Sequence, residues 1–123
     1  MNKQSFLEAH ENVGETYAGL VLGQDDEPDY HLFLLDEKPS SLLNWAAAVE
    51  WAETLEATIP SPRELSLLFA NRPDAFEAQW HWSNSPDSAN KDKAWAQSFE
   101  DGSRVLIAKK TNCRARAIRR VFI

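Results

Sequence analysis

Cysteine is almost absent from this sequence of 123 residues. Its single copy, Cys113, excludes a disulfide within the chain and any site built from several thiolates. No apolar run approaches the roughly 18 residues that cross a bilayer, and the N-terminal residues lead into no apolar core of a signal peptide. No linker, repeat or low-complexity tract interrupts the chain. We therefore expect a protein without membrane contact, located in the cytoplasm.

The composition is typical of one globular domain. Hydrophobic residues make up 43% of the chain and charged residues 26%, which argues against disorder. Domains most often contain about 100–150 residues. We therefore expect a single domain over residues 1–123.

Basic residues are concentrated near the C-terminal end. The chain has 13 Lys and Arg against 19 Asp and Glu, a net charge of −6, yet residues 104–123 hold seven basic residues and no acid. Such asymmetry can mark a surface for anions or nucleic acid. Nucleic-acid-binding domains are usually basic overall, however, so we expect no nucleic-acid partner and a basic strand beside acidic segments of the same chain. The candidate acids are residues 25–27, 36–37 and 100–101.

A helix and a hairpin are expected at the start of the chain. Ser5 and Glu8 have the spacing of a capping box, which predicts a short helix over residues 5–11. Residues 17–22 and 30–35 predict two strands around one turn, and the second, apolar on both faces, is expected to be central in its sheet. Gly19 predicts a bulge or a close backbone approach.

Two longer helices follow. Asn44 is a good N-cap for a helix that ends near Glu56. Ser61, Pro62 and Glu64 give the strongest local signal, because they combine an N-cap, a proline at the first helical position and a capping-box glutamate.

Four short strands are expected after the second of these helices. Asp101-Gly102 predicts a two-residue hairpin turn between the middle pair. The predicted strands cover residues 79–83, 94–99, 104–108 and 115–123. The order of strand hairpin, two helices and a run of strands predicts an α+β domain.

Four segments, in order along the chain, resemble the motifs of a known family. Residues 44–52 resemble its W-x-x-A-x-x-x-A helix, and residues 59–71 its L-P-T-x-x-E-L-x-L-L-x-x-N helix. Residues 80–85 resemble its Y-W-S-S strand, and residues 115–121 its closing V-R-A-V-R-R strand.

On these motifs the chain resembles a bacterial and phage domain family named for the C-terminal domain of a Legionella collagen-like protein. The resemblance covers residues 13–122 and leaves residues 1–12 as an N-terminal helical extension. It implies a C-type lectin-like fold, in which two helices pack on short antiparallel sheets. A fold of this kind hosts many functions, so the resemblance says less about activity than about architecture.

The five tryptophans are expected mainly in the core. Each buries about 150–250 Å² when packed, which a small domain needs for stability. Trp80 and Trp82 alternate along one predicted strand, so they are expected on one face, with His81 on the other.

No metal site is expected. Residues 27–29 have the letters of the calcium-binding triplet of sugar-binding C-type lectins, but they precede the two helices, whereas that triplet follows them. Asn84, Asp87, Asn90 and Asp92 match no calcium-loop pattern. The histidines and the cysteine lack the short spacing of zinc ligands.

The sequence does not indicate an enzyme or a cofactor. It contains no nucleophile elbow, Walker loop or dinucleotide fingerprint, and no set of residues meets the roles of nucleophile, base and orienting group. Cys113 is expected to be a small, buried apolar side chain. Its basic neighbours Lys110 and Arg114 could lower the pKa of the thiol, so a reactive thiolate stays open as an alternative.

Our first hypothesis is a non-enzymatic binding module that engages a protein partner through a loop. In lectin-like folds the region after the two helices often carries binding, and residues 83–93 of this chain are polar and rich in Ser, Asn and Asp. The predicted partner-binding residues are Trp82, Asn84, Asp87, Asn90 and Lys93. The acidic charge and the resemblance to a phage family suggest a phage- or prophage-encoded protein that engages a host protein, in the manner of inhibitors of host defence.

Two alternatives stay open. The first is an adhesin-type domain that binds sulfated glycans, as the family's namesake suggests. Its predicted anion-binding residues are Lys109, Lys110, Arg114 and Arg116. The second is a phage structural or tail-associated component, which would self-associate or be present in virions.

Overall fold

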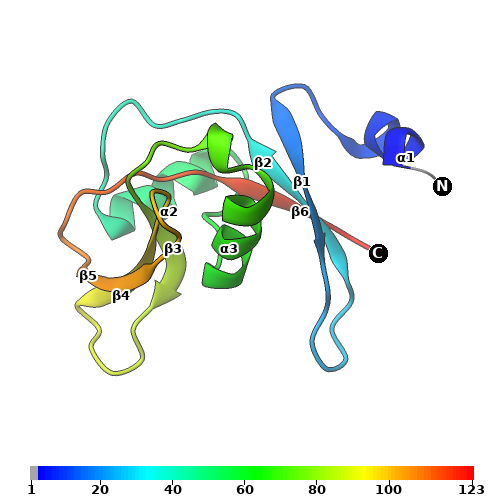
Figure 1. The fold of residues 1–123 in the computed structure, drawn as a ribbon. Coiled ribbons are helices and arrows are strands. Elements are labelled where there is room, and N and C mark those ends of the chain that lie inside the picture. Colours follow the sequence, from blue (N-terminus) through cyan, green and yellow to red (C-terminus); the bar gives the residue numbers. More distant parts are fainter. Residues whose placement is uncertain (1–2) are drawn as a thin grey trace.

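The first of two antiparallel sheets brings segments near both ends of the chain together (Figure 1). The structure is a computed structural model that describes residues 3–123, so Met1 and Asn2 of the predicted N-terminal extension lie outside the described residues. The sheet contains β1 (Glu15–Val21), β2 (Tyr30–Leu35) and β6 (Ile118–Phe122), in the order β1-β2-β6. The predicted hairpin and the central position of its second strand are confirmed.

The second sheet follows the helices in sequence. It contains β3 (Trp80–Pro86), β4 (Lys93–Ser98) and β5 (Arg104–Ala108), in the order β3-β4-β5. All four strands predicted after the helices are present, but the predicted two-residue turn is wrong. Because β4 ends at Ser98, residues 99–103 form a longer loop, in which the Asp101 carboxylate accepts hydrogen bonds from the Ser103 amide and hydroxyl.

Two of the α-helices begin at the predicted caps. α2 (Trp45–Thr54) follows Asn44, whose side chain accepts a hydrogen bond from the Ala47 amide at 2.9 Å. α3 (Pro62–Asn71) follows Ser61 and has the complete capping box, with proline at its start. Local sequence decides these starts because each cap satisfies amides only three residues away. A short 3₁₀-helix (Pro73–Ala75) comes after α3.

α1 (Lys3–His10) packs on the outer face of the first sheet. Phe6 contacts the rings of Tyr17, His31 and Phe33, with centroid distances between 4.0 and 6.0 Å. None of the described residues of α1 is buried. The helix begins at Lys3, so Ser5 lies inside it and the predicted cap at Ser5 is wrong.

Gly19 marks a close contact between β1 and the end of α3. The β1–β2 register shifts between Tyr17 and Gly19, where φ is 133°. A Cβ at Gly19 would lie 2.9 Å from the Asn71 side chain, which donates a hydrogen bond to the Ala18 carbonyl at 2.7 Å. The predicted bulge and the predicted close approach therefore both occur.

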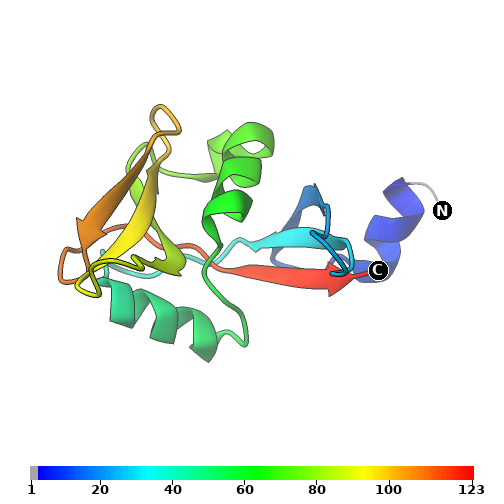
Figure 2. The same ribbon diagram turned by 90° about the horizontal axis from the view of Figure 1, so that it is seen from below.

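α3 lies between the two sheets (Figure 2), and the core is divided into two clusters. In the first cluster, the inner face of β1-β2-β6 packs against α3 through Leu32, Leu34, Ile118, Leu65 and Leu68. In the second cluster, α2 packs against the second sheet through Ala48, Ala52, Trp82, Ala94 and Ala96. These findings confirm the α+β class.

Residues 113–118 connect the two halves of the fold. Isolated bridges pair Cys113 with Leu43, Arg114 with His81, and Ile118 with Thr58. The Trp82 amide donates to the Arg114 carbonyl, and the Arg114 amide donates to the Trp80 carbonyl, both at 3.0 Å. Arg114 is therefore held against β3 by its backbone.

The basic C-terminal strand pairs with acids of its own chain, as predicted, but with different ones. Arg119 forms an ion pair with Glu15 at 2.7 Å, and Arg120 forms one with Glu64 at 2.7 Å. Among residues 3–123, none of the acids expected from the sequence takes part in an ion pair. The reason is positional: Glu15 and Glu64 lie on elements packed in or against the sheet of β6, whereas the expected acids lie in loops.

Glu64 is fully buried, and its carboxylate has four hydrogen-bond donors. It accepts from the Ser61 amide at 2.8 Å, the Tyr30 hydroxyl at 2.7 Å, and Nε and Nη2 of Arg120 at 2.7 and 2.8 Å. Burial acts to raise the pKa of Glu64, but the bonds from Arg120, Ser61 and Tyr30 outweigh it and lower the pKa. Burial and the Glu64 carboxylate raise the pKa of Tyr30 to about 12. The carboxylate thus joins α3 to β2 and β6.

Glu64→Gln is expected to lower the free energy of unfolding by about 3 kcal/mol, because it leaves the Arg120 guanidinium without its counter-ion. The matched control is Glu77→Gln, which removes the exposed Lys38–Glu77 pair at 3.3 Å and is expected to cost less than about 1 kcal/mol. Urea unfolding of both variants at pH 7 measures the difference. Equal, small losses would contradict the central role given to Glu64.

Candidate functional site

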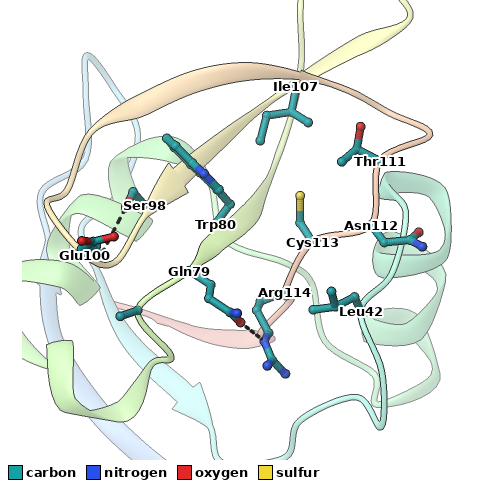
Figure 3. A pocket seen from close by; sticks show the side chains of 11 residues that line it. Leu42, Gln79, Trp80, Ser98, Glu100, Ile107, Thr111, Asn112, Cys113 and Arg114 are labelled. Atoms are coloured by element: carbon teal, nitrogen blue, oxygen red, sulfur yellow. Dashed lines mark hydrogen bonds between the residues drawn. The ribbon is translucent and has the colours of Figure 1, made fainter.

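A cleft of about 320 Å³ opens beside the second sheet (Figure 3). Trp80 and Ile107 contribute to it from the sheet, and residues 111–114 line its other side together with Leu42. We call this hollow the Trp80 cleft. Its volume is at the lower end of the roughly 300–1,000 Å³ that ligand pockets usually have, so it can hold a small molecule or a short stretch of peptide.

Trp80 and Trp82 have opposite roles, although they alternate along one strand. Trp82 is fully buried, and its indole N–H donates to the Leu43 carbonyl at 2.8 Å. Trp80 is 37% exposed and lines the cleft. Both side chains lie on one face of β3, but the second core cluster packs only on Trp82 and leaves Trp80 partly exposed. The expectation of Trp82 as a partner-binding residue is therefore corrected, because a completely buried indole has no surface to offer.

A smaller cavity of about 20 Å³ lies next to the Trp80 cleft. We call it the cationic pocket, because three of the side chains that line it are basic and one is acidic. These charged residues are Lys38, Arg114, Arg116 and Glu77. Arg114 lines both hollows and donates from Nε to the Gln79 side chain.

Arg116 is a buried cation without a carboxylate partner. It is only 4% exposed, and no ion pair to it occurs within residues 3–123. Its guanidinium donates to the carbonyls of Ala75 and Leu35 and lies 5.0 Å from the Phe76 ring centroid. Burial lowers the pKa of Arg116, although the carboxylates of Asp36 and Glu77 act to raise it. Its predicted role as a surface residue for glycans is corrected, since it can reach a ligand only through the cationic pocket.

His81 forms an uncharged wall of the cationic pocket. The side chain is 1% exposed, and its Nδ1 lies 3.0 Å from the Gln79 carbonyl. Burial, together with the positive charges of Arg116 and Arg114, lowers the pKa of His81 to about 4. The imidazole is therefore neutral at pH 7 and adds no positive charge to the pocket.

The polar side chains of the predicted binding loop mainly form hydrogen bonds within the loop itself. The Asp87 carboxylate accepts from the Asn90 amide at 3.1 Å, and the Asn90 side chain accepts from the Asp92 amide at 3.0 Å. Asn84 is half-buried, and its side chain accepts from the Ser85 hydroxyl. Lys93 is exposed at the start of β4. None of these residues lines the Trp80 cleft.

The four residues of the glycan alternative occupy two separate places. Lys109 and Lys110 line a hollow of about 350 Å³ together with Asp92. The Lys109 ammonium lies 4.6 Å from the Trp45 ring centroid, a cation–π contact within the chain. Arg114 and Arg116 line the cationic pocket instead.

Cys113 lies at the Trp80 cleft as a buried, protonated thiol. It is 6% exposed, and burial raises its pKa to about 11. The prediction of a small, buried side chain is confirmed, and the raised pKa does not support a reactive thiolate. Within the described residues, no group of three or more His, Cys, Asp or Glu side chains is placed to hold a metal ion.

Comparisons with known proteins give no indication of what this site binds. No protein-family model and no curated protein matches the chain. Over residues 3–123, no helix has the length and apolar character needed to cross a membrane. The family resemblance stays a prediction.

Sequence reasoning missed most of the residues that shape this site. Leu42, Gln79, Lys38 and Glu77 come from loops, and no local pattern distinguishes them. The available signal was the set of basic residues near Arg114. We interpreted them as a basic strand beside acidic segments, and only the glycan alternative assigned them to anion binding.

Trp82→Ala is expected to destabilise the protein by about 3–5 kcal/mol, because it opens a cavity in the second cluster. Trp80→Ala is expected to cost only about 1 kcal/mol, because the indole stands at the rim of the cleft. Thermal and urea unfolding of the two variants provide the comparison. A similar loss for both would show that Trp80 is part of the core.

Lowering the pH from 7 to 4 is expected to reduce stability through His81. Its folded-state pKa of about 4 is below the unfolded value near 6.5, so the unfolded state binds the proton first, and the loss reaches about 3 kcal/mol at pH 4. The contribution of neutral His81 to the free energy of unfolding is complete above pH 6.5 and is lost progressively below that pH. Urea unfolding of His81→Phe across this range should show a shallower pH dependence, and an unchanged slope would contradict the assignment.

Proposed function

We propose that this chain is a non-enzymatic module that binds a partner protein in the Trp80 cleft. The observation that supports this most is the 37% exposed indole of Trp80 at a hollow of about 320 Å³. Leu42 lines the same cleft and is 42% exposed. Exposed tryptophans beside apolar side chains are typical anchor points of protein interfaces.

The proposed scaffold is the C-type lectin-like fold. Three features support it: β2 and β6 join segments near the two ends of the chain, α2 and α3 come between the first hairpin and the second sheet, and that sheet follows directly. On such a scaffold the candidate surface belongs to the later sheet and its neighbouring loops. The binding site proposed here is displaced from residues 83–93 to the cleft at the other end of β3.

Saccharide binding is the second candidate function. Gln79, Thr111 and Asn112 line the same cleft as Trp80 with amide and hydroxyl groups, and an aromatic ring in a cleft with a few polar groups also suits a sugar ring. A sulfated glycan would further use Lys109, Lys110 and Arg114. Retention on heparin that falls steeply with salt, and that is lost in Lys109→Ala/Lys110→Ala, would favour this candidate.

The resemblance adds a proposal about the biological setting. A phage- or prophage-encoded protein of net charge −6 would suit a basic host protein, including one that acts in defence. A structural or tail-associated phage component is the alternative, and it predicts stable self-association by sedimentation or presence in purified virions.

Affinity capture from a bacterial lysate tests the main proposal. The unaltered chain is expected to enrich one dominant protein, and Trp80→Ala is expected to lose at least 90% of it while remaining folded. The matched control is Lys93→Ala, an exposed residue of the loop, which is expected to retain the partner. Loss in Lys93→Ala with retention in Trp80→Ala would return the site to the loop, and capture of no protein at low salt would contradict protein binding.

A further inference from the structure

We propose that the Trp80 cleft and the cationic pocket form one site for the C-terminal residue of a partner protein. In this arrangement the terminal carboxylate binds at Arg114, and the apolar side chain of the same residue lies against Trp80. This inference rests on the proposed function and specifies which part of the partner the cleft recognises.

The two hollows adjoin through a shared wall. Arg114 lines both of them. Gln79 accepts a hydrogen bond from Arg114 Nε and stands next to Trp80 in the chain. Figure 3 shows the Arg114 guanidinium at the rim of the cleft beside Gln79, on the side opposite Ile107. A ligand that reaches both hollows must therefore carry its anionic group close to its apolar group.

The side chains that line the cationic pocket carry an excess of positive charge. Lys38, Arg114 and Arg116 carry three positive charges, His81 is neutral, and Glu77 carries the one negative charge and already pairs with Lys38. The result is a pocket of net charge +2 in a chain of net charge −6. Asp36, outside the lining of the pocket, also acts electrostatically on Arg116, so the net charge falls from +2 to +1 when Asp36 is counted. The remaining positive charge still favours a bound anion.

Two of the guanidinium groups have donors left over. Arg114 uses Nε for Gln79, and no hydrogen bond to either of its Nη atoms occurs within residues 3–123. The Nε atom of Arg116 is buried and has no hydrogen-bond partner among the described residues. A carboxylate can accept from the two Nη atoms together, the bidentate geometry in which arginine binds this group best.

The size of the cationic pocket favours a carboxylate oxygen over a larger anion. Its volume of about 20 Å³ holds roughly one water-sized atom. One oxygen of a planar carboxylate can enter while the other stays at Arg114, whereas a whole sulfate or phosphate group is too large to enter the pocket.

The charged residues of the Trp80 cleft also favour one orientation of a bound partner peptide. Glu100 lines the cleft at its left edge in Figure 3, beside Ser98, whereas the Arg114 guanidinium lies at the bottom. The negative charge of Glu100 repels a carboxylate and suits a basic residue. A chain that ends at Arg114 and carries a basic residue a few positions earlier satisfies both ends. A C-terminal residue carries its carboxylate and its side chain on one Cα. These two groups are therefore close enough together for one to bind Arg114 while the other contacts Trp80.

Titration of the ¹⁵N-labelled full chain with acetyl-alanyl-leucine tests the inference. The free acid is expected to shift the Trp80 indole and Arg114 Nε resonances, and the peptide with an amidated C-terminus is expected to bind at least tenfold more weakly. Arg114→Gln is expected to lose at least tenfold in affinity for the acid, and Arg114→Lys to lose less because it keeps the charge. The matched control Lys91→Gln, an exposed cation outside both hollows, should bind as the unaltered chain does.

Equal binding of the acid and the amide would overturn the inference, as would unchanged affinity in Arg114→Gln. Shifts at Trp80 with glucuronic acid but not with the peptide would also overturn it, in favour of a saccharide. If the lysate partner is lost in Trp80→Ala but kept in Arg114→Gln, this inference fails while the proposed function stands. Capture of no partner by any variant is a failure of the proposed function itself.

Discussion

The buried ion pair between Glu64 and Arg120 is the interaction on which the arrangement of the fold depends. Glu64 caps α3 through Ser61 and at the same time receives Arg120 from β6 and the Tyr30 hydroxyl from β2. A carboxylate that is fully buried is costly unless its lone pairs are satisfied. One side chain therefore sets the start of a helix and the position of that helix on the first sheet.

The position of α3 in turn sets the position of the site. α3 lies between the two sheets (Figure 2), and the chain that leaves the second sheet must return to β6 through residues 113–118. This return segment pairs with β3 by its backbone, which brings Arg114 beside Trp80. The Trp80 cleft and the cationic pocket are thus formed at the junction of the two halves, and the second of them is lined by more basic than acidic side chains.

Features that depend on local sequence could be predicted, whereas the burial of individual side chains could not. The caps at Asn44 and Ser61 and the bulge at Gly19 were predictable because they depend on neighbours in the chain or on one unusual backbone angle. The different roles of Trp80 and Trp82 were not, since both belong to one face and only the second cluster decides which is covered. The loop of Asp87 and Asn90 has a polar composition that suggests binding, but its polar groups also satisfy one another.

The sequence by itself determined the class of the fold, the strands, two helix starts and the fact that the basic C-terminal strand has acidic partners in the same chain. Only the tertiary structure decided that these partners are Glu15 and Glu64, which are 104 and 56 residues from the arginines they bind. It also decided that Arg116 is buried with no ion pair to it among residues 3–123, and that Trp80 faces a cleft. The reason is physical: capping and strand periodicity act between residues close in sequence, whereas burial and ion pairing depend on which distant segments the packed core brings together.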